Sequence, residues 1–158
     1  MEGKMHRSLF SQLDDLDYAI ANALQENARL PFTQIAKDLD VTEKTVRMRV
    51  QQMQEEGVLS LVGVVNPVKV GLNVQVYIQI AVEACKLDDV VAALNEIYEA
   101  RLVVLTSGEY QLIIQVLLRD YDELSEFLMT KLNKIDGITK VNVINMLKVI
   151  KSRFKFIR

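Results

Sequence analysis

Residues 32–57, FTQIAKDLDVTEKTVRMRVQQMQEEG, constrain the fold more than any other stretch of this chain. Their apolar residues have helical spacing twice, first at Ile35, Ala36 and Leu39 and then at Val46, Val50 and Met53. Val41 falls between the two groups, where an apolar side chain can fix the crossing angle of two helices. Thr42 can cap the second helix by accepting a hydrogen bond from the amide of Thr45, and Gly57 can end it in the left-handed conformation. The stretch therefore predicts a helix-turn-helix.

The second of these helices has a free face suited to DNA. Together with the capping threonine, the candidate DNA-binding residues are Thr42, Lys44, Thr45, Arg47, Met48, Gln51 and Gln52. Lysine and arginine bind phosphates and guanine edges, glutamine binds adenine edges, and threonine or methionine can contact a thymine methyl group. Arg49 lies beside the apolar seam, and we expect it to brace the fold or to reach a flanking phosphate. Periodicity by itself leaves a second interpretation open, an amphipathic helix pair whose outer face only contacts water.

The charge of the chain is an argument against nucleic-acid binding. The formal net charge is −2, and residues 1–65 carry seven basic and ten acidic side chains, a net of −3. The charges are unevenly placed, since residues 44–54 contain Lys44, Arg47 and Arg49 and no acid. Local charge matters at a groove because the Debye length is about 8 Å at physiological salt. We therefore expect modest DNA affinity from each module and a gain from oligomerisation.

One helix precedes the helix-turn-helix, and a β-rich connection follows it. Residues 13–27 predict the first helix, with Asp14 or Asp15 as its cap, and Pro31 marks the break after it. Residues 58–65, VLSLVGVV, are mostly β-formers and predict a strand or small wing that leads into a linker. We expect a DNA-binding domain at residues 1–60, a β linker at 61–72, and an oligomerisation and effector domain at 73–158.

The second half of the chain alternates strands and helices. Strands are predicted at residues 73–83, 101–106, 110–118 and 140–150. Helices are predicted at 87–99, with Val90, Val91, Leu94, Ile97 and Tyr98 on the buried side, and at 120–134, with Leu124, Phe127, Leu128 and Leu132. The order is βαββαβ, the ferredoxin-like arrangement with two helices on one face of an antiparallel sheet. The expected fold class is α+β, a helix-turn-helix domain followed by a ferredoxin-like domain.

The sheet face opposite these helices is expected to be apolar too. Residues 111–118, QLIIQVLL, and 141–150, VNVINMLKVI, have apolar side chains in both registers. A sheet covered by helices on one side ordinarily shows polar residues on the other. We therefore expect another subunit to cover this face, which makes the protein at least a dimer. The alternative is that one of these strands is assigned in the wrong register.

Several classes of protein are disfavoured by what the sequence lacks. One cysteine, Cys85, allows neither a disulfide within the chain nor a structural zinc cluster, and the single histidine, His6, has no metal-ligand set around it. No stretch approaches the roughly 18 apolar residues of a membrane helix, and residues 1–12 lack the apolar run of a secretory signal. We expect a cytoplasmic protein with no metal, no cofactor and no membrane partner.

Short motifs along the chain resemble the Lrp/AsnC family of transcription regulators. The matching residues are Leu13-Asp14-Asp15-Leu16-Asp17, Ala28-Arg29-Leu30, Ile35-Ala36, Val41-Thr42, Arg49-Val50, Glu56-Gly57-Val58, Gly71-Leu72, Gly108-Glu109-Tyr110 and Gly137-Ile138. They occur in the order and at the spacings of that family, and the order of the domains matches as well. The resemblance implies a regulator that binds double-stranded DNA and dimerises through its βαββαβ domain, often assembling further into tetramers or octamers.

The resemblance also implies a small effector, frequently an amino acid, bound between subunits. The corresponding residues here are Thr106, Gly108, Glu109, Tyr110 and Gln111, and the last strand offers Asn142 and Asn145. A glycine turn lets backbone amides approach a ligand carboxylate, and Glu109 can meet an amine. The family often has an aspartate where this chain has Gln111, and a threonine or serine where it has Val143 and Ile144. Two alternatives stay open, a plain hairpin tip in water and a regulator without an effector.

Two further functions are alternatives to DNA binding. Siroheme decarboxylases resemble this chain in architecture, but their chemistry needs histidines and arginines around an acidic macrocycle, and residues 107–118 contain no histidine. No nucleophile and general base are paired in the sequence, and its paired acids are placed as helix caps: Asp88, Asp89, Asp120 and Asp122. We therefore expect no enzyme. A ligand-sensing protein that does not bind DNA is the other alternative, because the first half is acidic.

Overall fold

A computed structural model describes residues 13–151 of the 158-residue chain. These residues form two compact units, 13–63 and 64–150. Each unit has a hydrophobic core of its own. None of the helices that the structure describes is long and apolar enough to cross a membrane.

The first unit contains three helices, α1 (Asp15–Glu26), α2 (Phe32–Asp38) and α3 (Glu43–Glu55). All three contribute to its buried core, which consists of Ile20, Ala21, Leu24, Ile35, Ala36, Val46, Val50 and Met53. Val41 lies half-buried in the turn between α2 and α3 and packs against this core. The predicted helix-turn-helix is therefore confirmed, and its inner face is the one that the apolar spacing predicted.

Local side chains determine where these helices begin and end. Asp14 caps α1 in a capping box, since its carboxylate accepts from the amide of Asp17 at 2.8 Å and the Asp17 carboxylate accepts from the amide of Asp14. The Thr42 hydroxyl accepts from the amide of Thr45 at 3.1 Å, as predicted. Gly57 follows α3 with a φ of 70°, the left-handed conformation in which a helix commonly ends.

The connection after α3 differs from the prediction. Residues 58–66 form neither strand nor helix, and the side chains of Val62, Val64 and Val65 are exposed. β-forming residues make a strand only when their backbone groups find a partner strand, and no described residue pairs with this segment. The predicted strand or wing at 58–65 is therefore wrong for the single chain. A 3₁₀ turn, η1 (Val68–Val70), follows.

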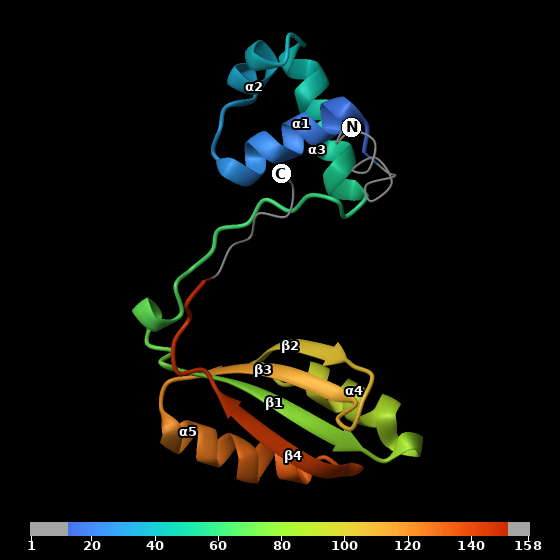
Figure 1. Ribbon diagram of the computed structural model, residues 1–158, viewed down its shortest axis with the longest axis vertical. Helices are drawn as coiled ribbons and strands as arrows, with labels where there is room; N and C mark the ends of the chain where they lie inside the picture. Colours follow the sequence, from blue (N-terminus) through green and yellow to red (C-terminus); the bar gives the residue numbers. More distant parts are fainter. Residues whose placement is uncertain (1–12, 152–158) are drawn as a thin grey trace. The chain divides into compact units, whose positions relative to one another are not determined.

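The second unit has the predicted ferredoxin-like order. It consists of β1 (Val74–Val82), α4 (Leu87–Asn95), β2 (Ala100–Leu105), β3 (Leu112–Leu118), α5 (Tyr121–Glu126) and β4 (Ile138–Asn145), with a 3₁₀ turn η2 (Ala84–Lys86) before α4. The strands form one sheet in the order β2-β3-β1-β4, and every neighbouring pair is antiparallel. Both helices lie against the same face of this sheet (Figure 1). The α+β fold class is confirmed.

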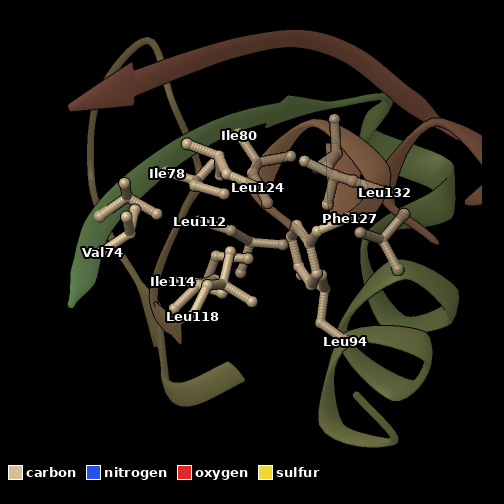
Figure 2. Packing of buried hydrophobic residues seen from close by; sticks show 14 residues of the cluster. Val74, Ile78, Ile80, Leu94, Leu112, Ile114, Leu118, Leu124, Phe127 and Leu132 are labelled. Carbon is tan, nitrogen blue, oxygen red and sulfur yellow. The ribbon is translucent and has the colours of Figure 1, made fainter. Parts of the chain in front are cut away.

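The core of this unit lies between the sheet and the two helices. Alternate residues of β1 are buried from Val74 to Val82, and the register pairs Ile78 with Ile114 of β3 on the same face. Figure 2 shows the ring of Phe127 among the side chains that β3 and α4 contribute, including Leu112 and Leu94. Because every second residue of β1 is buried, one face of β1 is turned to the helices. The register then identifies the residues on the same face of the neighbouring strands.

Three predicted elements have different bounds. α4 ends at Asn95, and a turn follows in which the amide of Ala100 donates to Ile97, so Tyr98 is 98% exposed and not buried as predicted. β4 begins at Ile138 and ends at Asn145, short of the predicted residue 150. The predicted long helix at 120–134 is α5, then a π-helical segment, η3 (Phe127–Lys131), and a 3₁₀ turn, η4 (Leu132–Lys134).

Candidate DNA-binding helix and effector loop

The candidate DNA-binding residues share the outer side of α3, because its apolar stripe is turned into the core. Lys44, Arg47, Met48, Gln51 and Gln52 are all exposed there. Thr42 and Thr45 lie at the start of the helix, where their hydroxyl oxygens are 2.8 Å apart. A helix that is anchored on one side and polar on the other can enter a major groove, and its first turns are the part that reaches base edges.

Several of these side chains already have a partner one helical turn away. Arg47 donates to the carboxylate of Glu43 at 2.6 Å, and its guanidinium lies 5.5 Å from the centre of the Phe32 ring of α2. Gln51 donates to Glu55 and Gln52 to Glu56, each at 2.8 Å. Residues 44–54 contain no acid, but the acids on either side are within reach of the polar face. Sequence reasoning missed this effect because it considered the stretch alone.

Arg49 braces the fold, which is one of the two roles expected for it. Its guanidinium donates to Asp14 at 2.7 Å and to Asp17 at 3.1 Å, and so joins α3 to the start of α1. The charge of Asp17 is the main reason why the pKa of Arg49 is raised. The pKa of Asp14 is lowered, chiefly by the hydrogen bond from the Asp17 amide and also by Arg49. This network sets the position of α3 on α1.

The candidate effector loop joins β2 to β3 and is closed by its own hydrogen bonds. The amide of Thr106 donates to the carbonyl of Gln111 at 2.8 Å, and the Thr106 hydroxyl donates to the carbonyl of Tyr110 at 2.5 Å. The side-chain oxygen of Gln111 accepts from the amide of Val82 at 3.0 Å, and its nitrogen lies 3.5 Å from the carbonyl of Gly108. The loop is therefore attached to the end of β1.

Lys140 of β4 reaches this loop, a contact that sequence reasoning did not predict. Its ammonium donates to Glu109 at 2.6 Å and lies 5.2 Å from the centre of the Tyr110 ring. The hydrogen bond to Glu109 is the main cause that raises the pKa of Lys140. A carboxylate, an ammonium and an aromatic ring thus lie together at one end of the sheet, beside the backbone of Gly108.

The two asparagines of β4 are placed differently from each other. Asn142 is two residues from Lys140, lies on the sheet face opposite the helices, and donates to Gln79 of β1 at 2.7 Å. Asn145 pairs with Val76, whose side chain points to the helices, so it lies on the other face. It is also about 16 Å farther along the strand than Lys140. Within one chain, Asn142 is near the loop and Asn145 is not.

Comparison with known proteins assigns both units. Residues 13–54 match the AsnC-type helix-turn-helix domain, and residues 75–156 match the Lrp/AsnC ligand binding domain. The chain belongs to the Lrp/AsnC family. It is a DNA-binding transcription regulator of that type, and its relatives carry the same description. Among the described residues, no group of three or more potential metal-ligating side chains was found.

Individual relatives span nearly the whole chain. The transcriptional regulator LrpA of Pyrococcus horikoshii is 34% identical over 82% of this chain and 92% of its own length. The regulatory protein AsnC of Escherichia coli is 30% identical over 86% and 91%, and a solved structure of E. coli AsnC superposes with a TM-score of 0.84 over 89% and 96%. A Neisseria meningitidis regulator, solved with L-Met, has the same fold at 22% identity, with a TM-score of 0.83 over 91% and 96%.

Proposed function

We propose that α3 of this regulator reads the DNA major groove and that Lys44, Thr45, Arg47, Met48, Gln51 and Gln52 make the contacts, with Thr42 at the start of the helix. The observation that carries this proposal is the two-sided character of α3, with Val46, Val50 and Met53 buried and the opposite side polar and exposed. We take the ligand of this face to be DNA because residues 13–54 match the AsnC-type helix-turn-helix domain. Because a regulator of this kind works on the genome, we place it in the cytoplasm.

Substitutions on α3 test the reading surface. Arg47→Ala should weaken binding to a selected operator by about 1–3 kcal/mol, the value of one good base contact. Gln51→Ala should have a smaller effect in the same direction, because glutamine is neutral. Fluorescence anisotropy with a duplex selected from a random pool measures both. If neither substitution changes the affinity, the contacts are made by another surface. If the wild-type chain shifts no DNA at all, a ligand-sensing protein without DNA binding becomes the better explanation.

The sheet of the second unit supports a homodimer. On the face opposite the helices, Leu102 and Val104 of β2 and Ile144 of β4 are exposed. The polar residues there are mostly neutral amides, such as Gln79 and Asn142. Close to a two-fold axis each residue meets its own copy, so like charges there would repel, whereas amides both donate and accept hydrogen bonds and can pair with themselves. This face is therefore suited to a second copy of the chain, and tetramers or octamers would be built from such dimers.

Light scattering tests the dimer. The chain has a mass of 18.0 kDa, so a dimer has twice that value, and a monomer at micromolar concentration would refute the proposal. Val104→Lys should dissociate the dimer because it buries a charge at the interface without a partner. Met129→Lys is the matched control, since Met129 is exposed on the helical side. A two-fold dimer also predicts a palindromic operator with half-sites about 10 bp, or a multiple of it, apart.

The loop at Thr106, Gly108, Glu109, Tyr110 and Gln111, with Asn142 nearby, is the proposed effector site. An amino acid presents one carboxylate and one ammonium, which are the partners that Lys140 and Glu109 need when their own ion pair opens. The effector would shift DNA binding by differing in affinity between assemblies, and a coupling of about 1–3 kcal/mol suffices. Asn145 of the same chain is not near this loop, so an asparagine at this position could contact the effector only from another subunit.

Calorimetric titration with each of the twenty amino acids tests this site. L-Methionine is the first choice because the neisserial structure contains it. Lys140→Gln should abolish the heat of binding, whereas Lys134→Gln, a change of the same charge on η4, should not. If no amino acid produces heat or changes the melting temperature, the regulator acts without an amino-acid effector.

We also propose that the chain is not an enzyme. The family relatives are transcription regulators. The loop region that a siroheme decarboxylase would use contains no histidine, and Asp120 caps α5 by accepting from the amide of Glu123 at 2.8 Å. Incubation of the purified protein with siroheme, followed by mass spectrometry, should show no loss of carbon dioxide from the macrocycle.

A further inference from the structure

Glu43 is the acid that pairs with Arg47 on the polar face of α3. It is the first residue of that helix, and its carboxylate accepts from Arg47 at 2.6 Å. The side chains of both remain open to solvent, with 63% of Arg47 and 42% of Glu43 exposed. The Arg47 guanidinium also lies 5.5 Å from the centre of the Phe32 ring. Arg47 therefore has two neighbours, a carboxylate on its own helix and a ring on α2.

An acid in this position lowers the non-specific affinity of α3 for DNA. Non-specific affinity comes from cations that neutralise phosphates, and Glu43 offsets the charge of Arg47 before any phosphate is met. Its own charge also repels phosphates that approach the start of α3. A negative charge at the start of a helix also stabilises the helix by interacting favourably with its dipole. The competing explanation for Glu43 is therefore that it only stabilises α3. That explanation predicts no effect on which base pair is preferred.

The pair also prepares Arg47 for one kind of base. An arginine that is already ordered loses less conformational freedom when it binds, and the Glu43 contact leaves most of its five N–H donors unused. Those donors match the two acceptors of guanine, O6 and N7. Glutamate can itself accept from the N4 amino group of cytosine, so the two side chains together offer one partner for each base of a G·C pair.

We propose that Glu43 is a specificity-determining residue of this regulator, which positions Arg47 toward guanine and lowers binding to unrelated DNA. The proposal rests on α3 being the helix that reads DNA. It goes beyond the candidate contacts, none of which is acidic. Glu43 acts partly through Arg47, and its effect should therefore depend on Arg47 being present.

Glu43→Gln in the full-length protein tests the proposal, because glutamine keeps the size and removes the charge. The wild-type operator is first selected from random duplexes, and affinities are then measured for it and for an unrelated duplex of equal length. Glu43→Gln should raise affinity for the unrelated duplex and lower the ratio of operator to unrelated binding about tenfold. Asp38→Asn removes the same charge from α2, where it accepts from Gln34, and should leave this ratio within about twofold of wild type.

A double substitution separates positioning from simple charge. In an Arg47→Ala background, Glu43→Gln should change the ratio clearly less than it does in the wild-type background, because the side chain that it positions is gone. Reselection with Glu43→Gln should also show a weaker preference at one G·C pair. An unchanged ratio in the single variant, or an equal loss with and without Arg47, would overturn the proposal. If the wild-type chain selects no operator, the role of α3 in reading DNA fails as well, which is a different result.

Discussion

Replacing Arg49 by methionine should destabilise the first unit and leave its DNA-reading face intact. Arg49 donates from α3 to the carboxylates of Asp14 and Asp17 at the start of α1. Methionine keeps an unbranched apolar stem of similar length, so the packing of that stem is largely retained. The change therefore removes mainly the ion pairs.

The burial of the partners determines the size of the effect. The side chain of Asp17 is 11% exposed and that of Arg49 is 29% exposed, whereas Asp14 is open to solvent. Removing one partner of a buried pair costs about 3–5 kcal/mol, and an exposed pair contributes about 0–1 kcal/mol. Because one of the two carboxylates is nearly buried and the other is exposed, we expect the free energy of unfolding to fall by about 2–3 kcal/mol. For a unit of this size the melting temperature should fall by on the order of 10 °C.

Circular dichroism at a helix wavelength, with hydrogen exchange over α1 and α3, measures this loss. Arg47→Met is the matched control on the same helix, because its pair with Glu43 is exposed and should contribute no more than about 1 kcal/mol to stability. Below both melting temperatures, Arg49→Met should retain operator affinity and Arg47→Met should lose it. An Arg49→Met protein as stable as wild type, but with a lower salt dependence of DNA binding, would show that Arg49 contacts a phosphate instead.

Two further predictions concern the turns and the response to acid. Gly137→Ala should lower the free energy of unfolding by about 2–5 kcal/mol, because a φ of 96° strains alanine and the new Cβ would lie 2.5 Å from the Cβ of Lys86. Gly71→Ala is the control, since Gly71 has a φ of 90° but open space around it, and the loss there should be about 1–2 kcal/mol. Urea unfolding measures both. For Asp14, the folded-state pKa is lowered by the Asp17 amide, so its stabilising contribution is complete above about pH 4 and is lost as the pH falls below that value. Asp14→Asn should remove that part of the acid dependence, and an unchanged acid-unfolding curve would contradict this.

The helix-turn-helix could be predicted from the sequence because its signals are local. The apolar spacing of Val46 and Val50, the cap at Thr42 and the stop at Gly57 all act within a few residues. The strand predicted at 58–65 failed for the complementary reason, since a β-strand depends on a partner that the segment itself cannot supply. Propensity alone was therefore sufficient for helices with caps and insufficient for an isolated apolar segment.

The environment of the candidate sites depends on pairs that are distant in sequence. Lys140 and Glu109 are 31 residues apart, and Arg49 and Asp14 are 35 apart. Only the antiparallel pairing of β1 with β4 places Lys140 beside the loop that precedes β3, and only the packing of α3 on α1 places Arg49 at a helix cap. Residue type suggested which side chains could bind a ligand, but their partners could be identified only from the topology.

The π-helical segment between α5 and η4 should let the second unit tolerate the loss of a residue there better than in its strands. Phe127 and Leu132 are both buried, although five positions on an uninterrupted α-helix would turn them roughly 140° apart. The wider turn of η3 absorbs the difference, so the helix carries one residue more than its core contacts need. Loss of one residue among 128–131 would leave both side chains on the core side. A single deletion inside β1 would instead reverse the faces of every later residue in the strand. Length variation among relatives should therefore occur in this helix and be absent from the central strands.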